Sequence, residues 1–206
     1  MIAITKLRLG LAACCLLVAS GCATKEEPAA AAKAADVQLS CIAVLPVLPA
    51  SDIDDAGADN KALAEGSQVM NGLLKQVLAG QAKARFIADD KTSAGGAGLS
   101  QARQRAGQSG CNAALEISLS QYSERVGGDY GVKQPAAVTF AYKLYETGEG
   151  KVLCHGRFDE RQQSVMENLL TLPKAKTRGL NWLTAEELAR EGLQEKLGQC
   201  SYLGGK

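Results

Sequence analysis

The sequence is poor in aromatic residues, in histidine and in runs of one charge. Phenylalanine, tryptophan and tyrosine together make up 4% of the chain, so a hydrophobic core has to rest mainly on leucine, valine, isoleucine and alanine. The 23 basic and 22 acidic residues form no basic field that could hold a phosphate backbone. Nucleic acid is therefore not an expected partner.

Recognisable catalytic and metal-binding patterns are missing as well. His155 is the only histidine, and no nucleophile-elbow sequence accompanies it. The acidic residues between Asp52 and Asp59 lack the spacing of an EF-hand loop, and the glycines of 95–98 match neither phosphate-loop pattern. We therefore expect a protein that is not an enzyme and that holds no metal and no cofactor. A hydrolase that uses His155 in a Ser-His-Asp arrangement is an alternative.

Residues 1–21 have the three parts of an export signal. Lys6 and Arg8 supply the positive start, a short apolar stretch runs from Leu9 to Ala19, and small residues precede a cleavage point before Cys22. The apolar stretch is shorter than the about 20 residues that a membrane-spanning helix needs. We therefore expect residues 1–21 to be removed on export.

The segment from Val18 to Cys22 resembles the lipobox of bacterial lipoproteins. The resemblance implies that Cys22 is acylated, becomes the first residue of the mature chain and attaches it to a membrane. Ala19 stands where the lipobox most often has leucine, and an ordinary secretory signal with an incidental Cys22 is the alternative. Ala23, rather than aspartate, follows the cysteine. By resemblance to enteric lipoproteins, this residue implies the periplasmic face of the outer membrane.

After Cys22 the composition changes once more. Residues 22–39 are rich in alanine and contain no aromatic residue, so they cannot bury enough apolar surface to offset the entropy of ordering the chain. We expect a flexible spacer with a reach of about 20 Å, or alternatively a short helix through the alanines. Residues 40–203 are expected to form a single periplasmic domain.

Four cysteines lie in the expected domain: Cys41, Cys111, Cys154 and Cys200. An even number in an oxidising compartment allows two disulfides, for which three connectivities are possible. Their wide spacings contain no C-x-x-C pair, which argues against a zinc site. Buried free thiols are the alternative for some of them.

Hydrophobic periodicity predicts an α/β fold that begins with parallel strands. An apolar run over 40–48 is typical of a strand that is covered on both faces, and Pro46 and Pro49 are expected to mark its end. The next elements are expected to be a helix over 60–79, a strand over 83–88 and a helix over 100–107. The buried face of the first helix is predicted to contain Met70, Leu73, Leu74, Val77 and Leu78.

From Cys111 the period changes to two, which predicts an antiparallel meander of three strands. The full order is β-α-β-α-β-β-β-α, with helices packed on one mixed sheet. The capping-box residues Thr184 and Glu187 predict the start of the last helix. The meander strands are expected over 114–121, 137–146 and 151–160, and the closing helices over 164–170 and 184–197. Their predicted faces are Leu115, Ile117, Leu119 and Gln121 on the first strand, and Val138, Phe140, Tyr142 and Leu144 on the second.

Three short motifs give the domain a family resemblance. They are Ile42-Ala43-Val44-Leu45-Pro46 in the first strand, Gly110-Cys111-Asn112 at the next turn, and Tyr145-Glu146-Thr147-Gly148 at a later hairpin. In this order they resemble a group of envelope proteins that includes the TolB amino-terminal domain, the curli secretion lipoprotein CsgG and the penicillin-binding-protein activator LpoB. The resemblance covers roughly residues 40–200. It implies an α/β fold, a place in the envelope and binding rather than catalysis.

We therefore predict a non-catalytic accessory lipoprotein that binds another envelope component. The glycine-rich segment over 127–134, with Tyr122 and Tyr130, is the first expected binding surface, because tyrosine is enriched where proteins meet partners. A turn without a partner is the alternative for this segment. Residues 158–163 and 178–182 form a second candidate surface. The alternative is an oligomeric export pore component like CsgG, although charged residues at 124, 125 and 143 interrupt the apolar alternation that a lipid-facing strand needs. The surface residues that we predict are Tyr122, Tyr130, Arg161 and Trp182.

Overall fold

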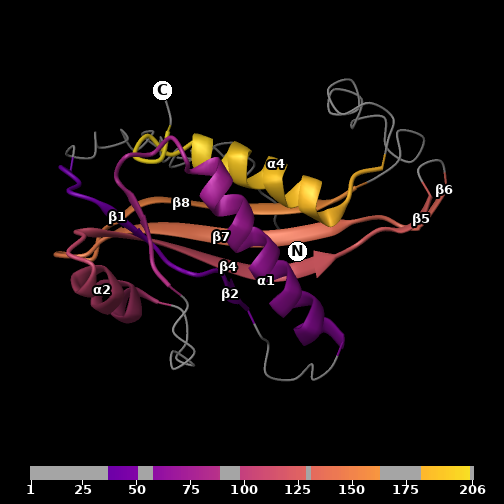
Figure 1. Ribbon diagram of the computed structural model, residues 1–206, viewed down its shortest axis with the longest axis horizontal. Coiled ribbons are helices and arrows are strands. Elements are labelled where there is room, and N and C mark those ends of the chain that lie inside the picture. The colour runs from indigo at the N-terminus through magenta and orange to yellow at the C-terminus, as the bar shows by residue number, and fades with distance from the viewer. Residues whose placement is uncertain (1–36, 51–57, 89–97, 129–130, 163–181, 205–206) are drawn as a thin grey trace, which may run out of the picture. The chain divides into compact units, whose positions relative to one another are not determined.

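The computed structural model describes residues 37–50, 58–88, 98–128, 131–162 and 182–204 (Figure 1). These residues belong to one compact unit, Asp36–Lys206. The expected export signal, the lipid site Cys22, the expected helix over 164–170 and Tyr130 lie outside the described residues and stay predictions. In the described part of the chain, no helix is both long and apolar enough to cross a membrane.

Six of the described strands form one mixed sheet with β4 (Ala113–Ser123) in its middle. β4 pairs in parallel with β1 (Ile42–Val44) and antiparallel with β7 (Ala137–Glu146). Outside these strands, β3 (Ala84–Phe86) pairs in parallel with β1, and β8 (Val152–Arg161) pairs antiparallel with β7. The predicted order of elements and the predicted mixed sheet are confirmed.

The first predicted strand is wrong in one respect, because the structure divides it in two. After β1 the chain leaves the ladder, and it pairs with β4 again farther along as β2 (Leu48–Pro49). Pro46, between the two strands, has no N–H to donate to a ladder. The N–H of Val47 donates instead, at 2.9 Å, to Asn71 Oδ1 of the first helix, which packs on one face of the sheet. Pro49, which we expected to end the strand, is the last residue of β2.

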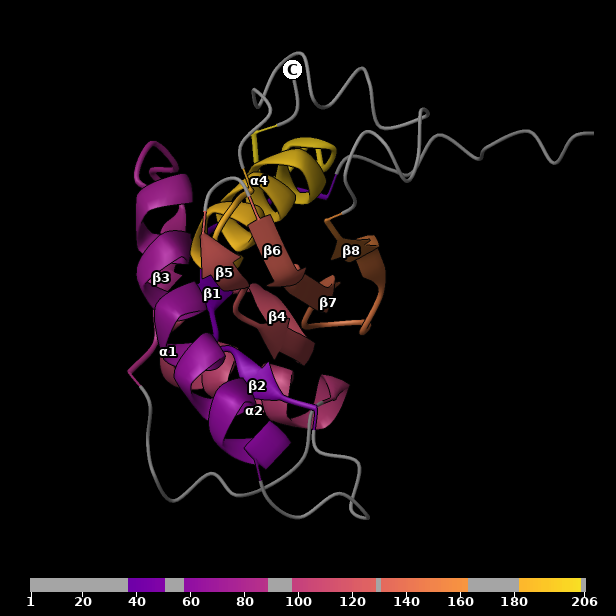
Figure 2. The same ribbon diagram turned by 90° about the vertical axis from the view of Figure 1, so that its right-hand side faces the viewer.

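Among the described helices, two cover one face of the sheet and one covers part of the other face (Figures 1 and 2). α1 (Ala58–Val77) and α4 (Ala185–Gly198) contact each other and bury the main core. α2 (Leu99–Gln108) packs on the opposite face, over β1 and the beginning of β4. The predicted face of α1 is confirmed, except that Val77 is only half-buried. Its buried members are Met70, Leu73, Leu74 and Leu78.

The predicted core face of β7 and the predicted start of α4 are also confirmed. The Thr184 side chain accepts the N–H of Glu187, and the Glu187 carboxylate accepts the N–H of Thr184 at 2.8 Å, which completes the capping box. Just before this cap Leu183 packs against the main core, whereas Trp182 is half-buried. The buried residues of β7 include Val138, Phe140, Tyr142 and Leu144.

The structure selects one of the three possible disulfide connectivities. Cys41 pairs with Cys111, with 4.8 Å between their Cα atoms, and joins the start of β1 to the turn before β4. Cys154 pairs with Cys200, with 5.8 Å between their Cα atoms, and joins β8 to the chain after α4. The first disulfide lies in the core under α2 and the second borders the main core, so each face of the sheet has one covalent link.

Two of the family-like motifs meet at one end of the sheet. The Asn112 side chain accepts hydrogen bonds from the N–H and the hydroxyl of Ser40, at 2.8 and 3.0 Å, and donates to the carbonyl of Gln38 at 2.9 Å. The carbonyl of Asn112 accepts the N–H of Thr147 at 3.0 Å. The disulfide between Cys41 and Cys111 lies next to Asn112. Together these contacts fasten residues 38–41 to the sheet, at the point where the expected spacer ends.

The turn between β7 and β8 is held by two side chains. The N–H groups of Glu149 and Gly148 donate to the Glu146 carboxylate at 2.7 and 2.6 Å, which lowers the pKa of Glu146 from its ordinary value. Arg103 of α2 donates to the carbonyls of Thr147 and Gly148 at 2.8 and 2.9 Å. The third motif therefore has a structural role, since it joins α2 to the sheet.

Two glycines allow the helices to approach the sheet closely. At Gly66 of α1 a methyl group would overlap the ring of Tyr122, and at Gly192 of α4 it would overlap the ring of Phe158. Phe158 in turn stacks on Phe140, with 5.4 Å between the ring centroids. Each glycine therefore leaves room for an aromatic ring between a helix and the sheet.

We expect Gly66→Ala to lower the free energy of unfolding by about 1–3 kcal/mol, because the added methyl group has to displace the packed ring of Tyr122. Gly72 lies in the same helix, and its methyl group would meet no neighbouring atom within 4 Å. Gly72→Ala should therefore raise the free energy of unfolding by about 0.5–1 kcal/mol. Urea unfolding of both variants measures the difference, and equal effects would contradict the packing described.

Candidate functional site

The face of β4, β7 and β8 that points away from α1 and α4 carries mainly polar side chains. In the described part of the chain α2 covers this face only at one end of the sheet, where Ala102 and Ala106 pack in one cluster with Ala114 and Tyr145. Beyond α2 the cross-strand register places side chains in rows across the three strands, and we call this surface the polar face. Its rows are Glu116–Lys143–His155, Ser118–Ala141–Arg157, Gln121–Thr139–Asp159 and Ser123–Ala137–Arg161.

A β-bulge changes the direction of the side chains near the end of β4. The register with β7 shifts between Leu119 and Gln121, so Ser120 is an extra residue in β4. Strict alternation predicted Gln121 on the buried face with Leu119. That prediction is wrong, because the bulge turns Gln121 onto the polar face, opposite Thr139. Tyr122 continues the buried side and packs against the main core.

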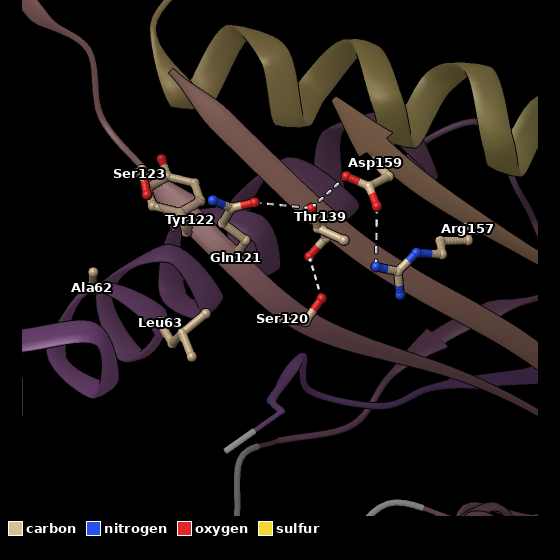
Figure 3. A pocket seen from close by; sticks show the side chains of 9 residues that line it. All are labelled: Ala62, Leu63, Ser120, Gln121, Tyr122, Ser123, Thr139, Arg157 and Asp159. Atoms are coloured by element: carbon tan, nitrogen blue, oxygen red, sulfur yellow. Dashed lines mark hydrogen bonds and ion pairs between the residues drawn. The ribbon is translucent and has the colours of Figure 1, made fainter. Parts of the chain in front are cut away.

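Hydrogen bonds connect the row Gln121–Thr139–Asp159 (Figure 3). Thr139 is 4% exposed, and its hydroxyl lies 3.0 Å from Asp159 Oδ1 and 3.2 Å from Gln121 Oε1. A hydroxyl carries one hydrogen, so it donates to one of these oxygens at a time. Arg157 donates to the second oxygen of Asp159 at 3.1 Å. Arg157 therefore holds one carboxylate oxygen of Asp159, and the Thr139 hydroxyl holds the other when it donates to Asp159 rather than to Gln121.

A cavity of about 380 Å³ lies beside this row (Figure 3). β2 pairs with β4 as far as Leu119, and the next four residues of β4 line the cavity. α1 contributes an apolar wall opposite the polar groups. The volume falls within the range of ligand pockets, about 300–1,000 Å³. The lining residues are Ala62, Leu63, Ser120, Gln121, Tyr122, Ser123, Thr139, Arg157 and Asp159.

The cavity suits recognition by hydrogen bonding. Arg157 supplies donors, Asp159 supplies acceptors, and the serine hydroxyls supply both. His155 lies in a different row, opposite Lys143. Among the residues that the structure describes, no cluster of three or more histidine, cysteine, aspartate or glutamate side chains could hold a metal ion.

Tyr122 forms the boundary between the cavity and the core. Its ring is half-buried against Gly66. Burial of the phenol, together with the carboxylates of Glu124 and Glu186, raises the pKa of Tyr122 to about 12. The Glu124 carboxylate accepts the N–H of Ala185 at 3.1 Å, so it also binds the first turn of α4, where the helix dipole favours negative charge.

Three of the four residues predicted for the binding surface lie at this end of the sheet. Tyr122 lines the cavity. Arg161 ends β8 opposite Ala137, one row beyond Asp159. Trp182 is half-buried. Its neighbour Leu183 donates its N–H to the Gln162 side chain, just after β8, at 2.7 Å. We call this end of the sheet, with the cavity and these residues, the hairpin end.

The hairpin end takes its name from β5 (Val126–Gly128) and β6 (Gly131–Gln134), which lie between β4 and β7 in the chain. They pair antiparallel as a separate two-stranded sheet that extends from the main sheet (Figure 1). Val126 is 52% exposed. The fourth predicted surface residue, Tyr130, follows β5 but lies outside the described residues.

Sequence reasoning missed the residues at the centre of the site. Thr139 was assigned only to a strand, Asp159 was named only within the second candidate surface over 158–163, and Gln121 was placed on the wrong face. The alternation of polar residues with Cys154, Gly156 and Phe158 along β8 could have indicated a polar face. The cross-strand row itself had no sequence signal, because it depends on the bulge in β4 and on the register of three strands.

Solved structures with a similar fold include three bacterial proteins. The PelC dodecamer from Paraburkholderia phytofirmans is 13% identical with a TM-score of 0.46, over 81% of this chain and 88% of that chain. Lipoprotein GNA1162 from Neisseria meningitidis is 16% identical with a TM-score of 0.40, over 68% of this chain and 96% of that chain. The LpoB C-terminal domain from Escherichia coli is 18% identical with a TM-score of 0.38, over 63% of this chain and 88% of that chain.

No protein-family model matches the sequence, and no curated protein matches it. At these identities and TM-scores the similarity concerns the fold alone. The function therefore has to be argued from the residues of this chain.

Tyr122→Phe should change how the free energy of unfolding depends on pH above about 10. With a pKa of about 12 against an ordinary 10.0, Tyr122 keeps its proton in the folded state at a pH where the unfolded chain has released it. Its contribution to the free energy of unfolding is therefore complete below pH 10.0 and lost as pH rises toward 12. In a tyrosinate absorbance titration the variant should lack the phenol that ionises at about pH 12. An unchanged titration would contradict the burial of this ring.

Proposed function

We propose that the chain is an exported lipoprotein, held on the periplasmic face of the outer membrane by acyl chains on Cys22. The pattern of residues 1–21 and the lipobox-like segment before Cys22 support this location. The disulfides give independent support, because all four cysteines of the domain are paired and disulfides persist in oxidising compartments such as the periplasm. Residues 22–39 would then separate the domain from the membrane.

The role that we propose for the domain is non-catalytic binding of another envelope component. The observation that carries this role is the row Gln121–Thr139–Asp159 beside its cavity. Thr139 and Arg157 hold the Asp159 carboxylate in place before any partner arrives. Groups fixed in this way lose little conformational entropy on binding, which favours recognition of a polar segment of a partner.

The rest of the hairpin end supports the same role. Tyr122 follows Gln121 and lines the cavity, and Arg161 lies one row beyond Asp159. Trp182 comes before α4. The β5–β6 hairpin is a separate two-stranded sheet, and an isolated hairpin of this kind is only marginally stable in water. Contact of the exposed Val126 with a partner would bury apolar surface and stabilise the hairpin.

Labelled palmitate tests the anchor. The wild-type chain should incorporate the label, and Cys22→Ser should not, because the acyl groups need the cysteine at that position. The variant should also no longer sediment with outer membranes. Cys15→Ser is the matched control, since Cys15 lies in the segment that is removed, and it should leave the labelling unchanged. Equal labelling of the Cys22 variant and the wild-type chain would disprove the anchor.

Photocrosslinking in intact cells tests the binding site. A photoreactive amino acid at Gln121, in the cavity, should give an adduct with a protein other than this chain. The same amino acid at the exposed Lys151, at the opposite end of β8, is the matched control and should give none. Asp159→Ala should reduce the Gln121 adduct, because it removes the carboxylate of the row. Failure to obtain a specific adduct from Gln121 in repeated trials would refute this role.

A further inference from the structure

The two edges of the sheet differ in length. β3, at one edge, has three residues, whereas β8, at the other edge, has ten and pairs with β7 along its length. In the part of the chain that the structure describes, no strand pairs with the outer side of β8 (Figure 2). A long edge strand presents a row of N–H and C=O groups to which another strand can add.

The charges along β8 have a specific order. On the polar face the strand presents, in sequence, His155, Arg157, Asp159 and Arg161, and all four are exposed. The side chains of Arg157 and Asp159 are 60% and 62% exposed. Charges of a single sign on an edge strand would oppose pairing between copies. Here a carboxylate follows a guanidinium two residues along, so one antiparallel arrangement of two copies matches opposite charges.

We propose that β8 pairs antiparallel with β8 of a second copy of this chain, around a two-fold axis at Phe158. In this register Arg157 of each copy lies directly opposite Asp159 of the other copy, and the axis repeats the pair. Side chains that face each other across an antiparallel ladder have Cβ atoms about 5 Å apart, which brings a guanidinium within reach of a carboxylate. The two sheets become one continuous sheet through the paired edges.

The charge order selects this register among its neighbours. A shift of two residues in one direction puts Arg157 opposite Arg157 of the second copy, and a shift in the other direction puts Asp159 opposite Asp159. Like charges directly opposite each other destabilise a ladder. A shift of one residue would turn the charged side chains to the face that carries the core. A register centred on Glu160 would also match opposite charges, Asp159 with Arg161, but it would pair only residues 159–161 of each β8. The register centred on Phe158 pairs residues 155–161 of both copies, so it combines two opposite-charge pairs with a longer ladder.

Contacts on both faces of β8 hold this edge strand in a fixed conformation before any pairing. The disulfide between Cys154 and Cys200 ties β8 to the chain after α4, and Phe158 is 3% exposed beneath that helix. On the polar face Asp159 is already fixed by Thr139 and Arg157. A second copy would therefore meet a strand that is ordered on both faces, which reduces the entropy lost on pairing.

Charge exchange at the two positions tests the pairing. The full chain is extracted in detergent, with micelles in molar excess so that acyl chains of different copies do not share one, and its mass is measured by sedimentation velocity over a range of concentrations. The wild-type chain dimerises. Arg157→Asp or Asp159→Arg alone puts like charges opposite each other twice, and each raises the dissociation constant of the dimer by roughly tenfold or more. The double variant Arg157→Asp/Asp159→Arg restores both pairs and dimerises like the wild type.

An equimolar mixture of the two single variants is the matched control. Each is self-repelling, but their charges complement each other, so the mixture forms the heterodimer. This rescue also shows that neither single variant failed merely by unfolding. A wild-type chain that is monomeric at every concentration, single variants that dimerise like the wild type, or a mixture that stays monomeric overturns the pairing. The binding role of the cavity is tested separately by the adduct at Gln121, in a chain whose Arg157 and Asp159 are unchanged.

Discussion

β4 is the strand on which the rest of the domain depends. In the described sheet it is the one strand that pairs with parallel neighbours along one side and with an antiparallel neighbour along the other. Both helical layers pack on it, since Leu115 belongs to the core under α1 and α4, and Ala114 belongs to the core under α2. Leu115, Ile117 and Leu119 are 0% exposed, so a slip of one residue would turn all three out of the main core. The fixed register of β4 determines where every row across β7 and β8 lies.

The bulge at Ser120 places the residues after it along the cavity. Before the bulge β4 pairs with β2 on one side and with β7 on the other. After it β4 pairs only with β7, because β2 has ended. The extra residue lets Tyr122 enter the core beside Gly66 and sends Gln121 to the opposite face, in line with Thr139 and Asp159. Bulges often occur next to functional sites because they redirect side chains without breaking the sheet. One inserted residue thus separates the apolar and the polar sides of the cavity.

Features that follow local rules could be predicted from the sequence, and features that depend on the pairing of distant segments could not. The faces of α1 and β7 and the capping box at Thr184 each depend on spacing within one element, and the structure confirms them. The disulfide partners depend on topology, because Cys41 and Cys111 come together only when β1 and β4 start at the same end of the sheet. The interruption at Pro46 and the bulge at Ser120 are single-residue events inside apolar or alternating runs, which periodicity averages out. The row Gln121–Thr139–Asp159 depends on the bulge in β4 and on the register of three strands, so no local pattern predicted it.

The fastening of the chain before β1 has a mechanical consequence. Within five residues the backbone is held by the Tyr202 hydroxyl at Val37, by Asn112 at Gln38 and Ser40, and by a covalent bond at Cys41. A pulling force applied to the preceding segment would act on these attachments first. The disulfide would then transmit it from Cys41 to Cys111, in the turn before β4. The hydrogen bonds of β1 would stay unloaded until that bridge gave way. A domain tied to a moving surface by its amino terminus could therefore be tugged repeatedly without peeling its central strands apart.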